Sequence, residues 1–100
     1  MFSYICEYDL DVVYCRNRGI ARQQVYIALR EKLEARNYFR SQYSVWKKHH
    51  TTFAQEFEEL SLIANEIEAQ FFQGEQGIFK HFEFQRFTQQ TTIRGVEVEG

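Results

Sequence analysis

The strongest structural signal in the chain is TFAQEFEELSLIANEIEAQFFQG, residues 52–74. Thr52 followed by Gln55 is the pattern of a capping box, in which each side chain satisfies a backbone N–H at the start of a helix. Apolar residues then recur at steps of four and three, as on one side of a helix: Phe53, Phe57, Leu60, Ala64, Ile67 and Phe71. We expect this side of the helix, Phe57 included, to pack in the core, and Gly74 to follow its end.

The remaining segments predict strands and one further helix. Residues 2–9 are rich in aromatic and β-favouring side chains and predict the first strand. Residues 20–36 place apolar side chains at helical spacing, after a loop. Residues 39–48 and 78–87 alternate as strands do, and residues 91–98 predict a weak fourth strand.

This order predicts an α+β fold, namely a ferredoxin-like βαββαβ antiparallel sheet with two helices on one face. We expect one domain over residues 1–100, with residues 88–100 a swapped or weakly ordered tail. The second sheet face would be left bare, and a copy of the same chain is the simplest cover for it. We therefore expect a homodimer through the sheet, with Ile5, Tyr43 and Val45 as candidates for its interface.

The charges are unevenly distributed along the chain, although the net charge is only −2. Residues 16–50 carry nine basic side chains against Glu31 and Glu34, whereas residues 51–79 carry six acidic side chains and no basic one. A basic segment of this kind could hold a phosphate backbone, and it is equally typical of solvated helix faces.

Several classes of protein are disfavoured by the composition. No segment reaches the roughly 20 consecutive apolar residues of a membrane helix, so we expect no membrane partner. The first residues lack the basic and apolar regions of a signal peptide. The spacing of Cys6 and Cys15 fits neither a zinc site nor a disulfide framework, so we expect free thiols and a cytoplasmic protein.

Three carboxylates, Glu7, Asp9 and Asp11, come at the end of the predicted first strand. Glu7 and Asp9 share a face, because side chains alternate along a strand. Their oxygen atoms suit a divalent cation, most simply Mg²⁺ held by Asp9, which could activate a water or stabilise charge on a phosphate. Acidic residues at strand ends are also common without a function.

Basic, polar and aromatic side chains around the second strand suggest contacts to RNA. Such side chains can stack bases and hold phosphates, although they are more often part of a core or an interface. The candidate RNA-binding residues are Arg16, Arg18, Arg40, Gln42, Ser44, Trp46, Lys47 and Lys48.

Several short motifs resemble the virulence-associated protein D family. Tyr8-Asp9-Leu10 resembles the Phe-Asp-Leu that ends the first strand of that family. The stretch VYIALREKLE, residues 25–34, is similar to its first helix, and residues 39–46 resemble its second-strand signature of an aromatic residue followed by Gln-Gly-Ser-Val-Tyr. The chain departs from the family at Tyr43, where Gly is usual, and at Glu7, where a small residue is usual.

The resemblance implies a dimeric endoribonuclease of a toxin–antitoxin system, related to the small ferredoxin-like CRISPR-associated nucleases. It implies an acidic residue matching Asp9 in the dimer cleft, with RNA as the substrate and an antitoxin as a protein partner. We expect a metal-assisted reaction in which Asp9 is catalytic and Glu7 or Asp11 assists. The alternatives are a non-catalytic dimeric scaffold for nucleic acid, as in CRISPR adaptation, and a small-molecule-sensing regulatory domain.

Overall fold

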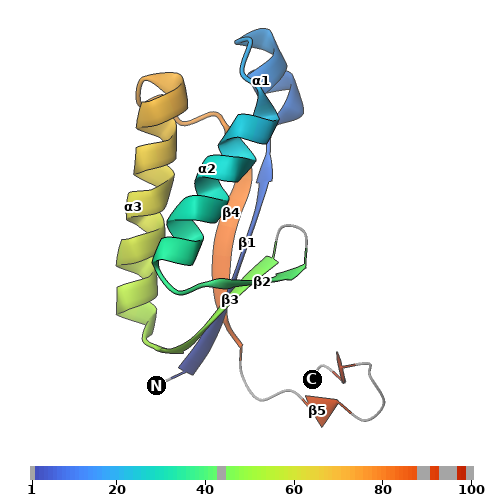
Figure 1. The fold of residues 1–100 in the computed structure, drawn as a ribbon, viewed down its shortest axis with the longest axis vertical. Coiled ribbons are helices and arrows are strands. Elements are labelled where there is room, and N and C mark those ends of the chain that lie inside the picture. Colours follow the sequence, from blue (N-terminus) through green and yellow to red (C-terminus); the bar gives the residue numbers. More distant parts are fainter. Residues whose placement is uncertain (1, 43–44, 88–90, 93–96, 99–100) are drawn as a thin grey trace.

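The computed structural model describes residues 2–42, 45–87, 91–92 and 97–98. Its main part is a four-stranded antiparallel sheet with helices over one face (Figure 1). The elements are β1 (Phe2–Leu10), α1 (Val12–Asn17), α2 (Arg22–Ala35), β2 (Phe39–Gln42), β3 (Val45–Thr51), α3 (Phe53–Phe72), β4 (Phe79–Phe87), β5 (Thr91–Thr92) and β6 (Glu97–Val98). The predicted α+β class and antiparallel sheet are confirmed, and the arrangement is broadly compatible with a ferredoxin-like plan. Among the described residues, no helix has both the length and the apolar character needed to cross a membrane.

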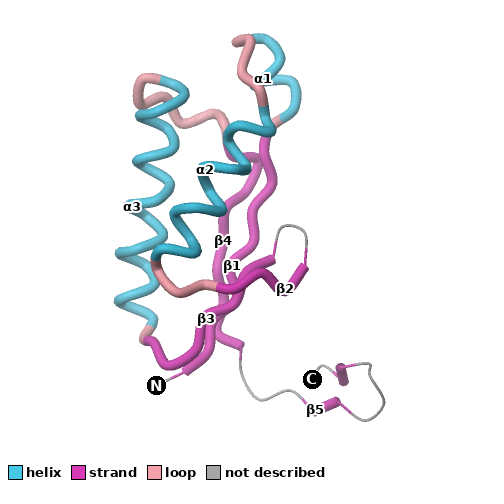
Figure 2. Tube along the Cα trace, in the orientation of Figure 1, coloured by secondary structure: helices cyan, strands magenta, loops and turns pink. Residues whose placement is uncertain are grey.

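The sheet has the strand order β2-β3-β1-β4, and α2 and α3 lie side by side over it (Figure 2). Within β1, Cys6 lies opposite Trp46 on β3 and Phe84 on β4. Burial alternates along this strand. The residues that face the helices are buried: Tyr4, Cys6, Tyr8 and Leu10. The partly exposed residues between them, Ser3, Ile5, Glu7 and Asp9, lie on the opposite face, called here the open face. The predicted faces of the first strand are therefore confirmed.

The second predicted strand, residues 39–48, is wrong as a single strand, because the structure divides it into β2 and β3. These two strands pair with each other, with Arg40 opposite Trp46. The segment contains no Gly, Pro, Asn or Asp that would have indicated a turn. Consequently β4 is the fourth strand of the sheet, whereas β5 and β6, in the part of the chain that the structure describes, form a separate pair. Tyr43 and, in the predicted tail, residues 88–90, 93–96 and 99–100 lie outside the described residues.

The predicted loop after β1 contains the short helix α1. The Asp11 carboxylate caps this helix by accepting a hydrogen bond of 2.9 Å from the backbone N–H of Tyr14. The Tyr14 ring packs against Phe72 at the end of α3, and its hydroxyl donates a hydrogen bond of 2.7 Å to Glu75. A Cβ atom at Gly77 would overlap the Tyr14 ring, so this position requires glycine. These contacts fix α1 against the end of α3.

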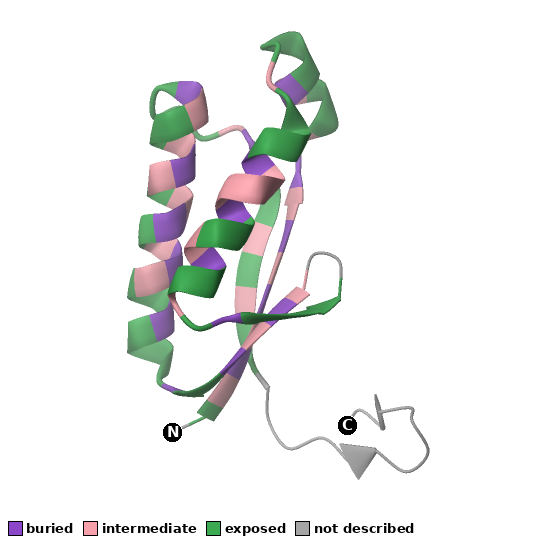
Figure 3. Ribbon diagram, viewed as in Figure 1, coloured by how far each residue is buried: buried purple, intermediate pink, exposed green. Residues whose placement is uncertain are grey.

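The predicted extent of α3 is confirmed, and so is the burial of Leu60 and Ile67, but the predicted burial of Phe53 and Phe57 is wrong. Thr52 caps the helix by accepting a hydrogen bond of 3.3 Å from the Gln55 N–H. Phe53 and Phe57 are 61% and 58% exposed. The buried side instead consists of Glu56, Leu60, Ile63, Ile67 and Phe72, which face α2 and the sheet (Figure 3). The helix is thus rotated so that a carboxylate, and not Phe57, enters the interior.

The buried carboxylate of Glu56 has polar neighbours on β3. The Thr51 hydroxyl donates a hydrogen bond of 2.7 Å to Oε1 of Glu56, whereas Oε2 is buried without a partner. The Lys48 ammonium lies 3.7 Å from Glu56 but donates its shorter hydrogen bond, 2.8 Å, to Glu59. Burial, with a smaller contribution from the charge of Glu59, raises the pKa of Glu56 to about 7.

This pKa predicts that stability decreases as pH rises from about 5 to about 7. In that range the unfolded chain releases the Glu56 proton and the folded chain retains it, so rising pH favours unfolding. Above about pH 7 the effect should level off. The carboxylates with lowered pKa values, Glu59, Glu66 and Glu75, act below about pH 4.5. Burial also raises the pKa of Glu68, and this contribution cancels when the wild type is compared with a variant that lacks only the Glu56 carboxyl group.

Urea denaturation at a series of pH values measures the effect. The matched Glu56→Gln variant keeps the shape of the side chain and has no proton to release. We expect its midpoint to change less between pH 5 and pH 7 than that of the wild type. Parallel pH profiles for the two proteins would contradict the assignment.

Candidate functional site

The structure brings two of the predicted catalytic carboxylates together with two further polar residues on the open face. On β4, His81 lies directly opposite Asp9, and Glu83 lies directly opposite Glu7. Side chains opposed in this way in an antiparallel sheet have Cβ atoms about 5 Å apart. Asp9 and Glu7 are partly exposed, and His81 and Glu83 are exposed. We call these four residues the acidic patch.

A small hollow of about 90 Å³ lies beside the acidic patch between β1 and β4. It is lined by Ile5, Glu7, Glu83, Phe84 and Gln85. Two carboxylates directly opposed across neighbouring strands repel each other, unless a cation or a shared proton lies between them. The hollow has room for a few waters at about 30 Å³ each. It therefore favours the approach of a cation to Glu7 and Glu83.

The oxygen atoms of the acidic patch suit a hydrated divalent cation better than a tightly enclosed one. Mg²⁺ commonly takes one or two carboxylates and keeps several waters, which Asp9 and Glu7 could accommodate. In the part of the chain that the structure describes, no three His, Cys, Asp or Glu side chains converge on a point where they could hold an ion. The residues thus fit the predicted cation only as a loosely held partner.

The neighbouring strands β2 and β3 make the open face basic and aromatic next to the acidic patch. Lys47, a predicted RNA-binding residue, lies opposite Ile5 on β1 and opposite Phe39 on β2. The Phe39 ring contacts the His49 ring, with 5.3 Å between centroids. His49 Nδ1 in turn shares a hydrogen bond of 2.6 Å with the Ser3 hydroxyl. The open face therefore combines carboxylates with a lysine and exposed rings.

Two residues predicted for the site serve the docking of α1 instead. Asp11 is the cap of that helix and accepts the Tyr14 N–H. The Arg18 guanidinium forms an ion pair of 2.8 Å with Glu75 and lies 3.9 Å from the centroid of the Tyr14 ring. Arg16 is exposed on the same helix. The structure does not bring Asp11 or Arg18 to the acidic patch.

Two further residues predicted to contact RNA lie on the helix side of the sheet. Trp46 is 1% exposed, and its indole N–H donates a hydrogen bond of 3.1 Å to the Tyr8 hydroxyl. Lys48 is buried beside α3, where it binds Glu59. Neither side chain is available to RNA, because both are held in the interior. Of the other candidates, Arg40 and Gln42 are exposed on β2, and Ser44 lies outside the described residues.

The sequence did not indicate His81 and Glu83 as members of the site. Both lie on a segment whose alternation predicts a strand, and this alternation is the signal that could have placed them on one sheet face. Their proximity to Asp9 and Glu7 depends on the register between β1 and β4, which are separated in the chain by three helices and two strands. Alternation alone does not fix such a register.

No protein-family model matches the chain, and comparison with curated proteins and with solved structures finds no match. A function for this chain therefore rests on the acidic patch and its surroundings.

Proposed function

We propose that the chain is an endoribonuclease that cleaves RNA phosphodiesters at the acidic patch, with Asp9 as the central residue. One observation carries this proposal. Asp9 and Glu7 lie partly exposed on the sheet face that the helices leave uncovered, and an imidazole, that of His81, is directly opposite Asp9. The resemblance of Tyr8-Asp9-Leu10 to virulence-associated protein D implies the same activity.

The residues of the acidic patch can perform the proton transfers of phosphodiester cleavage. The attacking oxygen must lose a proton, and the leaving oxygen must gain one. The Asp9 carboxylate would accept the first proton. The His81 imidazole would donate a proton to the leaving oxygen. The neighbouring position of the two side chains across β1 and β4 is what allows this division of roles.

The charge of the phosphate must also be neutralised. A divalent cation, Mg²⁺ by preference, would supply that neutralisation when held by Asp9 with Glu7. Lys47 supplies a positive charge from the chain itself. It lies on the open face, on the strand β3, two strands away from β4. Its ammonium would hold the backbone of RNA that crosses β1 and β3.

The same face would join two copies of the chain. The strand order β2-β3-β1-β4, with both long helices on one side, supports the ferredoxin-like assignment. Ile5 and Val45, two of the residues predicted for the interface, are partly exposed apolar residues on the open face. We expect light scattering at micromolar concentrations to return the mass of a dimer. A monomer mass throughout this range would remove the dimer from the proposal.

The proposed function also implies a cellular compartment and a protein partner. Cys6 and Cys15 are both free and buried, which fits a chain that works in the reducing cytoplasm. A toxin of this type would be held inactive by an antitoxin protein.

Incubation of the purified chain with labelled RNA tests the proposed activity. We expect internal cleavage that is faster with Mg²⁺ than with a chelator. Binding without cleavage under every metal tested would instead support the non-catalytic scaffold.

A further inference from the structure

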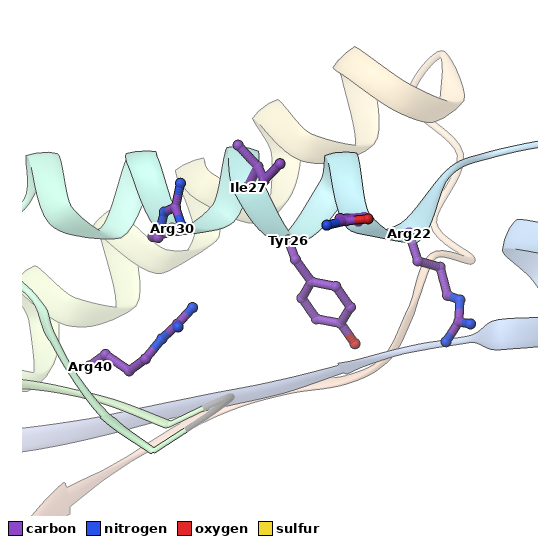
Figure 4. A pocket seen from close by; sticks show the side chains of 6 residues that line it. Arg22, Tyr26, Ile27, Arg30 and Arg40 are labelled. Carbon is purple, nitrogen blue, oxygen red and sulfur yellow. The ribbon is translucent and has the colours of Figure 1, made fainter.

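A groove of about 360 Å³ lies between α2 and the sheet, on the opposite side of the sheet from the acidic patch (Figure 4). Its lining residues are Arg22, Gln23, Tyr26, Ile27, Arg30 and Arg40. Arg22 and Tyr26 project from α2 toward the sheet, and Arg40 comes from the edge strand β2. Arg22, Tyr26 and Arg30 are spaced four residues apart, so they lie along one side of the helix.

A second hollow of about 340 Å³ continues this groove. It shares Arg30 and Arg40 with the first, so the two form one groove along α2 and β2. The additional lining residues are Glu34, Tyr38, Phe39 and Trp46. We call the combined surface the arginine groove.

The arginine groove is strongly basic. Its described lining residues include three guanidinium groups and one carboxylate, that of Glu34. The pair of Arg30 with Glu34 is 3.7 Å long, and both side chains are about half exposed, so it holds Arg30 only weakly. The Arg40 guanidinium lies 5.1 Å from the centroid of the Trp46 ring, which orients the group without removing its charge. Planar guanidinium groups in a row match the oxygen atoms of successive phosphates.

An exposed aromatic ring lies at the end of the arginine groove. Phe39 is 46% exposed and lines the second hollow, and its ring also contacts His49 on the open face. Phe39 therefore connects the groove with the face that carries the acidic patch, around the β2 edge of the sheet. A base can stack on such a ring only when it is unpaired, as in single-stranded RNA.

We propose that the arginine groove binds the sugar–phosphate backbone of single-stranded RNA, and that Phe39 stacks one of its bases where the strand passes to the open face. The identity of the ligand as RNA rests on the proposed function. The groove would then hold the substrate on one side of the β2 edge while the acidic patch acts on the other.

The salt dependence of RNA binding tests this proposal. A fluorescently labelled single-stranded RNA is titrated with protein at several salt concentrations, in an Asp9→Asn background that should leave the RNA intact. Each phosphate contact contributes about 0.7 to the slope of log K against log salt for single strands. We expect the double variant Arg22→Gln/Arg30→Gln to reduce the slope by about 1.4.

The matched control is Lys32→Gln/Arg36→Gln, which removes the same charge from the other side of α2. Lys32 and Arg36 face Glu66 on α3 at 2.7 Å and 3.6 Å, away from the groove. We expect this control to leave the slope unchanged. Circular dichroism of both variants checks that they fold. Equal losses of slope in the two variants, or none in the groove variant, would overturn the groove. Phe39→Ala should weaken binding at every salt concentration without changing the slope.

Cleavage by proteins with intact Asp9, measured in parallel, separates this proposal from the proposed function. A reduced slope in the groove variant without any wild-type cleavage would support the groove and reject the endoribonuclease. Wild-type cleavage with an unchanged slope in the groove variant would support the endoribonuclease and reject the groove. Failure of the wild type to bind single-stranded RNA would overturn the groove.

Discussion

The Asp9→Asn variant is expected to cleave RNA about 100-fold more slowly than the wild type, or slower still. Asparagine keeps the shape of the side chain and removes its charge, so it can neither accept the proton of the attacking oxygen nor attract a cation. Losing one electrostatic stabiliser of a transition state commonly costs about 10²- to 10³-fold in rate. Single-turnover cleavage of labelled RNA measures the effect. Asp9 is partly exposed at the end of β1, so the fold should be unchanged.

Three neighbouring carboxylates provide controls for this result. Glu7→Gln and Glu83→Gln should lower the rate less than Asp9→Asn, because each would assist only in attracting a cation. Asp11→Asn should leave the rate nearly unchanged, because asparagine caps a helix as well as aspartate does and Asp11 caps α1. Cleavage by Asp9→Asn at the wild-type rate would show that Asp9 is not catalytic.

The second large effect is expected for stability. Ile67→Ala should lower the free energy of unfolding by about 2–5 kcal/mol, the usual cost of truncating a buried isoleucine. Ile67 is fully buried on the side of α3 that faces α2 and the sheet, so the truncation leaves a cavity. Urea denaturation measures the change.

Phe57→Ala is the matched control on the same helix. The Phe57 ring is 58% exposed, and its centroid lies 6.2 Å from that of Phe53 and 6.5 Å from that of Phe84. We expect a loss of about 0.5 kcal/mol, as for most surface substitutions. A loss at Phe57 larger than that at Ile67 would mean that Phe57 is buried, as the sequence predicted.

The sequence predicted those elements that carry their own local signals. Alternation assigned Tyr4, Cys6 and Tyr8 to the covered face of β1, and the cap at Thr52 located the start of α3. Apolar spacing predicted the burial of Leu60 and Ile67 on α3, but it could not predict that Glu56, a carboxylate, occupies a core position. The Glu56 carboxylate can be buried because the Thr51 hydroxyl, at the end of β3, donates a hydrogen bond to it.

Elements without local signals were missed. α1 has only six residues, too few for a helical period to be visible. The division of residues 39–48 into β2 and β3 has no glycine or proline to mark it. The sequence predicts Trp46 and Lys48 on a surface accessible to RNA, whereas in the structure both side chains are buried on the helix side of the sheet.

The candidate site was predictable only on one strand. Alternation placed Glu7 and Asp9 on one face, but their neighbours on β4 depend on how the chain returns after α3. The arginine groove has the same origin. Its members come from α2 and β2, and their approach is set by the packing of the helix on the sheet and not by any local motif.

The location of RNA on the open face is tested most directly by nuclear magnetic resonance. Uniformly ¹⁵N-labelled Asp9→Asn protein is titrated with a short single-stranded RNA, and the shift of each backbone amide is recorded. We expect the backbone amides of residues 7–9 of β1 and 81–83 of β4, around the acidic patch, to shift. Unchanged amides in both segments, with RNA bound elsewhere or not at all, would contradict it.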